Sequence, residues 1–304
     1  MGPVALIGAA SGWGAGFREA QDGPAALREF GLAEHLTALG IPASWRAMIE
    51  SEKHWRDHSD LTAPEIFALV ARHGAALADA VAATIAARAF PVVLGGDHAI
   101  TIGTWGGVVR ALGGAKLGLI WFDAHLDAHT VATTPSMNPH GMGAAVLLGH
   151  GEREFLAIGG NVIRPENLCY VGIRSYEEGE LALLRRLGVR IYFMEEVHRR
   201  GLERIAEEAL AIATAGTQGF GMTIDLDGFD PPEVPGVGLK VPDGLHGAEV
   251  AAALRRIARH PGLRALEVVE YIPEFDRDQR TARLVANLIA AALIPAAAPA
   301  SKTA

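Results

Sequence analysis

Short apolar runs alternate with helical patterns along almost the whole chain, and this alternation limits the fold more than any other feature. The runs are nearly continuous in apolar residues, as expected of strands that are covered on both faces. Such runs occupy residues 4–8, 91–94, 117–122, 167–172, 189–193, 219–224 and 263–269. Helical patterns occupy residues 24–39, 64–89, 100–112, 177–187, 195–214, 246–258 and 277–293. This order predicts an α/β fold with a mostly parallel sheet between layers of helices.

Nothing in the sequence divides the chain into separate units. Half of its 304 residues are hydrophobic, which is enough for a large core, and there is no internal repeat or long Ser/Gly/Pro linker. We therefore expect one domain over residues 1–304. The Ala/Pro-rich tail from about residue 295 is expected to fray.

Charge and cysteine content exclude several classes of protein. The chain carries 27 Lys and Arg against 35 Asp and Glu, a net charge of −8, which argues against nucleic-acid binding. The one cysteine, Cys169, cannot form an internal disulfide, and a reducing, cytoplasmic setting follows as the expectation. No segment reads as an export signal or a membrane span.

Acids and imidazoles directly follow four of the predicted strands. The segments are Gly95-Gly96-Asp97-His98, Asp123-Ala124-His125-Leu126-Asp127, Asp225-Leu226-Asp227 and Glu270. In an extended segment, alternate side chains point the same way, so Asp123, His125 and Asp127 should converge. Four carboxylates in one pocket repel one another unless some are protonated or cations are present. Two divalent ions resolve this repulsion, and a carboxylate/imidazole set without thiolate suits Mn²⁺.

Each segment also has an ordinary structural interpretation. His98 after two glycines could be a cap or loop residue, and an isolated Asp-x-Asp is common in turns. The occurrence of all such segments at strand ends of one α/β pattern favours a metal site.

Three of these segments resemble the signatures of the ureohydrolase family, which includes arginases, agmatinases, guanidinobutyrases and formimidoylglutamases. They are the segments at residues 95–98, 123–127 and 225–231, and the resemblance extends over nearly the whole chain. It implies a three-layer α/β/α fold with an eight-stranded parallel sheet, two Mn²⁺ per subunit and a homotrimer or homohexamer. It also implies that His98, Asp123, Asp127 and Asp225 bind one ion, and that His125, Asp123, Asp225 and Asp227 bind the other. Asp123 and Asp225 would bridge the ions, and Asp127 would steer the hydroxide nucleophile between them.

Glu270 and His140 are the remaining candidates for catalysis. Glu270 could pair with an internal arginine, but its place in the family pattern implies that it orients a planar guanidinium. His140 could be a surface histidine, but its loop is similar to an arginase loop whose histidine moves protons, a task that suits an imidazole near its usual pKa. The same loop makes Thr134, Ser136 and Asn138 candidates for holding an amino-acid carboxylate.

The resemblance therefore implies hydrolysis of L-arginine to L-ornithine and urea. Three departures from the arginase pattern concern the far end of the substrate. His129 replaces an Asn that contacts the substrate carboxylate, Met137 replaces a Gly, and Glu177 replaces a shorter Asp near the α-amino group. An agmatinase, a guanidino-acid hydrolase, a formimidoylglutamase or a catalytically silent homologue remain as alternatives.

Overall fold

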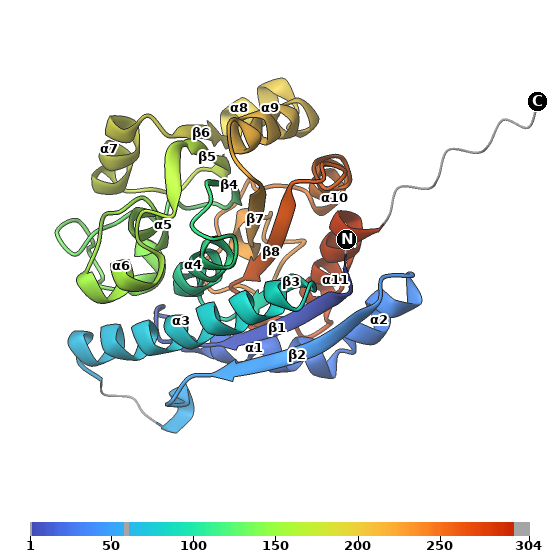
Figure 1. The fold of residues 1–304 in the computed structure, drawn as a ribbon, viewed down its shortest axis with the longest axis horizontal. Coiled ribbons are helices and arrows are strands. Elements are labelled where there is room, and N and C mark those ends of the chain that lie inside the picture. Colours follow the sequence, from blue (N-terminus) through green and yellow to red (C-terminus); the bar gives the residue numbers. More distant parts are fainter. Residues whose placement is uncertain (1, 58–60, 295–304) are drawn as a thin grey trace, which may run out of the picture.

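The computed structural model describes residues 2–57 and 61–294, and its centre is one sheet of eight parallel strands (Figure 1). The spatial order of the strands is β2-β1-β3-β8-β7-β4-β5-β6. Their bounds are β1 Val4–Ala10, β2 Ala43–Glu50, β3 Phe90–Gly95, β4 Leu117–Phe122, β5 Ile163–Ile173, β6 Arg190–Phe193, β7 Phe220–Asp225 and β8 Leu263–Val269.

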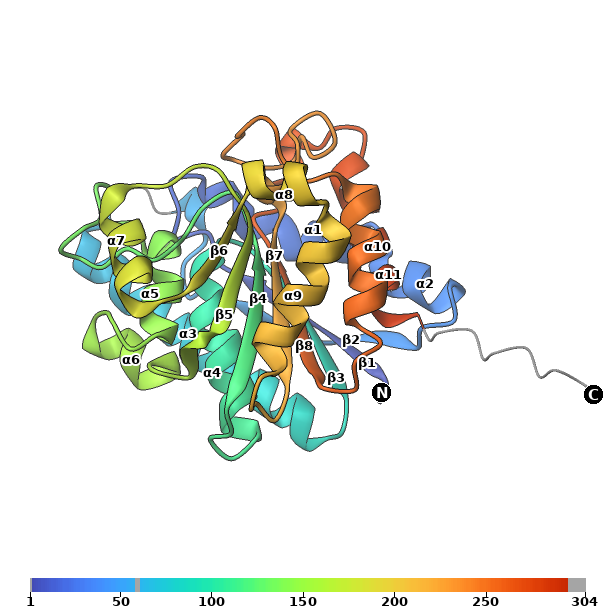
Figure 2. The ribbon, with the colours of Figure 1, turned by 90° about the horizontal axis from the view of Figure 1, so that it is seen from above.

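Helices cover both faces of this sheet, so the fold has three layers (Figure 2). One layer consists of α3 Ala63–Ala86, α4 Thr101–Ala111, α5 Gly143–Leu147, α6 Arg153–Gly159 and α7 Glu178–Leu187. The other consists of α1 Gly23–Glu29, α2 Leu32–Ala38, α8 Met194–Arg200, α9 Leu202–Thr214, α10 Gly247–Ile257 and α11 Arg280–Leu293. The predicted α/β/α architecture is confirmed.

Successive side chains of the strands enter two different cores because they point to opposite faces of the sheet. In β4, Leu119 and Trp121 belong to the core that also contains residues of α3, α4 and α7, whereas Ile120 and Phe122 belong to the core that also contains residues of α9 and α10. All four side chains are fully buried. This burial on both faces explains why the strands read as continuous apolar runs.

The sequence patterns missed strand β2. It lies at one edge of the sheet, pairs only with β1 and is half-buried along its length, and it carries Arg46 and Glu50. An edge strand exposed on one side does not need the continuous apolar run that identified the other seven. The eight-stranded sheet implied by the family resemblance is nevertheless present.

Two predicted helices are each broken in two by a glycine. Gly31, with φ of 80°, separates α1 from α2, and Gly201, with φ of 82°, separates α8 from α9. Such positive φ angles end a right-handed helix, and glycine adopts them without a steric penalty. The patterns also missed the short helices α5 and α6.

Four adjacent central strands, β3, β8, β7 and β4, end at the predicted site. Their carboxyl ends lie side by side because the sheet is parallel, and ligands bind at this edge in α/β folds. His98 follows β3, Asp123 follows β4, Asp225 ends β7 and Glu270 follows β8.

One described helix, α3, has the length and composition of a possible membrane span, but half of its apolar window is buried inside the protein. It packs along α4, so its apolar residues belong to the core of this fold. The predicted frayed tail from about residue 295 lies outside the described residues.

Candidate active site

The six predicted metal ligands meet at the carboxyl edge of the sheet in two groups. In the first group, Nδ1 of His98 faces three carboxylates. It lies 3.3 Å from Oδ2 of Asp123, 3.0 Å from Oδ2 of Asp127 and 2.9 Å from Oδ2 of Asp225. The four ligand atoms all lie within 4.8 Å of one another.

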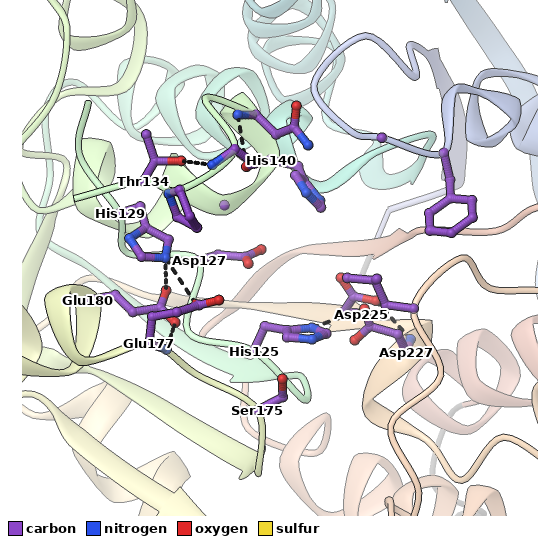
Figure 3. A pocket seen from close by; sticks show the side chains of 17 residues that line it. His125, Asp127, His129, Thr134, His140, Ser175, Glu177, Glu180, Asp225 and Asp227 are labelled. Atoms are coloured by element: carbon purple, nitrogen blue, oxygen red, sulfur yellow. Dashed lines mark hydrogen bonds and ion pairs between the residues drawn. The ribbon is translucent and has the colours of Figure 1, made fainter. Parts of the chain in front are cut away.

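The second group adjoins the first through Asp123. Nδ1 of His125 lies 3.1 Å from Oδ2 of Asp227 and 3.6 Å from Oδ1 of Asp123 (Figure 3 shows His125 beside Asp225 and Asp227). Because Asp123 offers a different oxygen to each group, it can bridge two cations. Asp225 joins only the first group, so the structure brings together the ligands of the second ion without the second bridging carboxylate that the family resemblance implied.

These donor atoms fit divalent cations. The Nδ1 atom of His98 is buried and has no hydrogen-bond partner among the described residues, although three carboxylate oxygens surround it. Burial, with the charges of Asp227 and Asp123, raises the pKa of Asp225 well above its usual value. An unpartnered imidazole nitrogen among crowded, buried carboxylates is the arrangement that a cation stabilises.

Turns, and not an extended backbone, bring these ligands together. Oδ1 of Asp123 accepts the backbone N–H of His125 at 2.7 Å, and Oδ1 of Asp225 accepts that of Asp227 at 2.8 Å. The segment 225–227 enters a short 3-10 helix after β7. The prediction that period-two alternation aligns the ligands was therefore wrong about the backbone, because aspartate side chains capture the N–H groups two residues ahead.

Asp127 and Glu270 both have backbone angles that are unusual for residues other than glycine, with φ of 48° and 66°. Such conformations are energetically costly and persist where the surroundings impose them. The main chain of Asp127 is fixed by its carbonyl, which accepts the N–H of Ala144 at 2.9 Å. The N–H of Glu270 donates to the carbonyl of Gly96 at 2.8 Å.

Buried polar groups orient the first-group ligands. Nε2 of His98 lies 2.9 Å from the hydroxyl of Thr223, which donates to Glu267 at 2.8 Å. Nε1 of Trp121 donates to Oδ2 of Asp123 at 2.7 Å. The sequence analysis missed these contacts, because the contacting residues lie within apolar strands and give no local signal. Such partners fix the rotamer of a metal ligand.

Asp97, the acid directly before His98, makes its hydrogen bonds to the backbone. Its carboxylate accepts the N–H groups of Gly14 and Ala99, each at 2.9 Å, and so caps the turn after β3. The imidazole of His98 is held instead from the strand β7 by Thr223.

Glu270 and His140 form a pair beneath the cavity. Nδ1 of His140 lies 3.3 Å from Oε1 of Glu270, which also accepts the backbone N–H of His98 at 2.9 Å. Burial lowers the pKa of His140, but the hydrogen bond and charge of Glu270 outweigh it and raise that pKa to about 9. The expectation of an ordinary histidine pKa is corrected: beside Glu270, the imidazole is protonated at neutral pH.

A cavity of about 370 Å³ opens above the second group of ligands. Its wall includes the predicted catalytic residue His140 and the predicted substrate-binding residues, namely His129, Thr134, Ser136, Asn138 and Glu177. Figure 3 labels His129, Thr134, His140 and Glu177 on this wall. Glu270 is not among its lining residues; it lies behind His140.

Hydroxyls fold the loop that carries Thr134, Ser136 and Asn138. Oγ1 of Thr134 accepts the N–H of Met137 at 3.0 Å, and Oγ of Ser136 accepts that of Asn138 at 3.2 Å. Met137, with φ of 60°, is more than a third exposed. The loop therefore presents small polar groups to the cavity and turns its large apolar side chain outward.

Residues 3–294 match the model of the Arginase family. The chain belongs to the arginase family. It is 38% identical over 293 residues to the arginase of Bacillus caldovelox, covering 95% of this chain and 97% of that one. The crystal structure of that arginase superposes with a TM-score of 0.88 at 35% identity, covering 98% and 100% of the two chains. The Brevibacillus brevis arginase is 34% identical over 297 residues, 94% of this chain and 96% of its own.

Within this arginase-family fold, the unusual His129 pairs with the unusual Glu177. Nε2 of His129 lies 3.1 Å from Oε2 of Glu177 and 3.7 Å from Oε2 of Glu180 (Figure 3). Glu177 is partly buried, which raises its pKa, but the hydrogen bond with His129 brings the pKa below its usual value.

Glu180 is a cavity residue that the sequence analysis missed. Burial, with the charge of Asp127, raises the pKa of Glu180 to about 8. Its Oε1 accepts the backbone N–H of Glu177 at 3.0 Å, forming the capping box that begins α7. The Glu-x-x-Glu spacing before an amphipathic helix was the available signal.

Proposed function

We propose that this protein hydrolyses L-arginine to L-ornithine and urea with two Mn²⁺ per subunit. The observation that carries the proposal is the pair of ligand groups sharing Asp123 at the base of a 370 Å³ cavity. Identities of 38% and 34% to curated arginases over nearly their whole length support arginine as the substrate.

The donor set supports manganese. It has carboxylates and imidazoles but no thiolate, a mixture that suits Mn²⁺. His98, Asp123, Asp127 and Asp225 would hold one ion, and His125, Asp123 and Asp227 the other. Asp225, which the structure places only in the first group, would complete the second set when the ions bind. When bound, a pair of divalent ions lowers the pKa of water toward neutrality and thereby supplies a hydroxide nucleophile.

The protein's own residues position the reacting groups. Asp127 lies at the boundary between the His98 group and the cavity, where its carboxylate can accept a hydrogen bond from the nucleophile. Glu270 would orient the guanidinium, which a carboxylate recognises with two parallel hydrogen bonds.

The reaction adds water across the guanidino carbon. The water oxygen forms a bond to Cζ of arginine, and the bond between Cζ and Nε breaks. Both protons of the water end on this nitrogen, so the products are urea and ornithine with a protonated δ-amino group. His140, a protonated imidazole on the cavity wall, is placed to exchange protons between the reaction and solvent.

The upper cavity would bind the amino-acid end of arginine. Thr134, Ser136 and Asn138 offer hydrogen bonds to the carboxylate, and Glu177, whose pKa lies below its usual value, offers negative charge to the α-ammonium. His129 would act at this end through its contact with Glu177. An ionised carboxylate near the ammonium favours arginine over substrates that lack this group.

A comparison of substrates tests the assignment. The manganese-loaded protein is expected to release urea from arginine faster than from agmatine or 4-guanidinobutyrate, and no formamide from formiminoglutamate. Preferred release from agmatine or a guanidino acid would transfer the assignment to those hydrolases, and formamide would indicate a formimidoylglutamase. Bound manganese without turnover of any of them would indicate a silent homologue.

We further propose that residues 1–304 form one catalytic domain of a cytoplasmic homotrimer or homohexamer. Multi-angle light scattering of the purified protein distinguishes these assemblies from a monomer, and cell fractionation tests the location.

A further inference from the structure

A second, larger cavity lies at the opposite edge of the sheet from the metal ligands. It has a volume of about 1010 Å³ and lies at the amino ends of β3 and β8, between the carboxyl ends of α10 and α11. In Figure 2 this is the edge near the N-terminus, away from the loops that follow β7. Its apolar floor includes the buried side chains of Phe90, Leu263 and Leu293. The size is that of a small-molecule site.

The polar groups of this cavity are almost all cationic. Arg88, Arg255, Arg259 and Arg264 line it together with His260, and no Asp or Glu is among the lining residues of the described chain. Within residues 2–57 and 61–294, none of the four arginines forms an ion pair. Arg256, which follows Arg255 on α10, forms ion pairs with Glu203 and Glu207 on α9.

Two of the basic side chains are held in place. The guanidinium of Arg264 donates to the carbonyl of Gln218 at 2.7 Å and lies over Gly219, where a Cβ atom would strike it. Its Nε is buried and has no hydrogen-bond partner among the described residues. Nδ1 of His260 accepts the N–H of Gly262 at 3.1 Å, and its ring packs edge-on against Phe220. Groups fixed in this way lose little freedom on binding a ligand.

Helix ends account for only part of this arrangement. A cation in the last turn of α10, such as Arg255, is stabilised by the helix dipole by about 0.3–1 kcal/mol. Arg88, however, follows α3 with φ of 61°, where glycine is the favoured residue. The dipole also gives no reason for Arg88 and the three arginines of residues 255–264 to line one concave surface that has no acid among its described lining residues, in a chain with a net charge of −8.

We propose that this cavity binds a small organic anion that carries at least two phosphate or carboxylate groups. Guanidinium groups bind both oxyanions through paired hydrogen bonds. The apolar floor would contact the carbon skeleton that joins the anionic groups.

Isothermal titration of the manganese-loaded protein tests this site with two probes at matched ionic strength. Fructose 1,6-bisphosphate represents the phosphates, and tricarballylate represents the carboxylates; binding of either one identifies the class of anion. Because both probes chelate Mn²⁺, each is also titrated into the same Mn²⁺ buffer without protein, and this heat is subtracted.

Paired variants locate the binding. Arg255 and Arg259 are exposed, so Arg255→Gln with Arg259→Gln should fold normally, as circular dichroism would verify. This double variant should bind the preferred probe at least tenfold more weakly, because hydrogen bonds to charged groups are lost. Arg256→Gln, the matched control, should change the affinity less than twofold.

Absence of binding by both probes at millimolar concentration would overturn the proposal. Unchanged affinity in the double variant, or equal losses in the double variant and the control, would overturn it as well.

Discussion

His129 Nε2 and Glu177 Oε2 lie 3.1 Å apart across the mouth of the candidate active site, at two positions where the sequence resemblance implies an asparagine and an aspartate. We interpret the two residues as a compensating pair. Glutamate is one methylene longer than aspartate, and the imidazole of His129 reaches the Glu177 carboxylate. His129 is fixed on its other side, where Nδ1 lies 3.1 Å from the hydroxyl of Thr133. We therefore interpret His129 as a residue that positions Glu177.

This pairing predicts coupled effects of substitution. His129→Asn should raise the KM for arginine several-fold with little change in kcat, because Glu177 loses the partner that fixes its carboxylate. In a protein that already carries Glu177→Gln, His129→Asn should cause little further increase in the KM for arginine. Steady-state kinetics of both single variants and the double variant give the coupling energy, which we expect to be about 0.5–1 kcal/mol for this partly exposed pair. Additive effects of the two substitutions would show that His129 does not act through Glu177.

Glu177→Ala should also change the choice of substrate. Its carboxylate is assigned to the α-ammonium of arginine, so kcat/KM for arginine should fall about tenfold or more, whereas that for 4-guanidinobutyrate should hardly change. Manganese content, measured by atomic absorption, should stay at the wild-type value. Loss of metal would instead make Glu177 part of the scaffold of the metal site.

The sequence predicted the chemistry of the site better than its shape. His98, Asp123 and Asp225 were found because a buried strand that ends in an acid or imidazole is conspicuous. The path of the chain between the ligands was not predictable from alternation, because Asp123 and Asp225 bind backbone N–H groups and form turns. Thr223 and Trp121 were not recognisable as ligand partners, since their role depends on contacts between strands that are distant in sequence.

The same distinction applies to the fold. Strands buried on both faces were evident from their composition, whereas the half-exposed edge strand β2 was not. A glycine within a helical pattern can be tolerated or can end the helix, and only the positive φ of Gly31 and Gly201 distinguishes these outcomes.

The contact between β4 and α9 depends on the absence of a side chain at Gly118. A Cβ atom there would collide with the carbonyl oxygen of Ala213 in α9. Gly118→Ala should therefore destabilise the protein by about 1–3 kcal/mol and lower the Tm by several degrees. Gly74, within α3, has room for a Cβ at ordinary contact distance, so Gly74→Ala should be neutral or raise the Tm. Differential scanning calorimetry at one manganese concentration compares the two, and equal shifts would contradict the packing argument.

The pair of His140 and Glu270 predicts a pH dependence of stability. Glu270 raises the pKa of His140 to about 9 in the folded protein, above the value of about 6.5 in the unfolded chain. The resulting stabilisation is complete below pH 6.5 and is lost as the pH rises to 9. The reason is that His140 loses its proton at a lower pH in the unfolded chain than in the folded protein. Thermal unfolding of chelator-treated protein should therefore show a smaller decline in Tm between pH 6.5 and 9 for Glu270→Gln than for the wild type. Identical declines would exclude the ion pair as the cause.

Asp127→Ala and Glu270→Gln should both abolish most of the activity, but for different reasons. Asp127 is one of the four ligand residues around His98, so its removal leaves a metal group with one carboxylate fewer. This variant should bind less manganese and lose kcat for every guanidino substrate. Among the described residues, Glu270 hydrogen-bonds to the His98 group through the backbone N–H of His98, which a glutamine oxygen can still accept. Glu270→Gln should therefore keep its manganese while kcat/KM for arginine falls about tenfold to a hundredfold, because the charge assigned to the guanidinium is lost. Metal analysis alongside urea release separates the two cases. Metal loss in Glu270→Gln would show that Glu270 supports the metal site. Full activity in that variant would show that another acid binds the guanidinium.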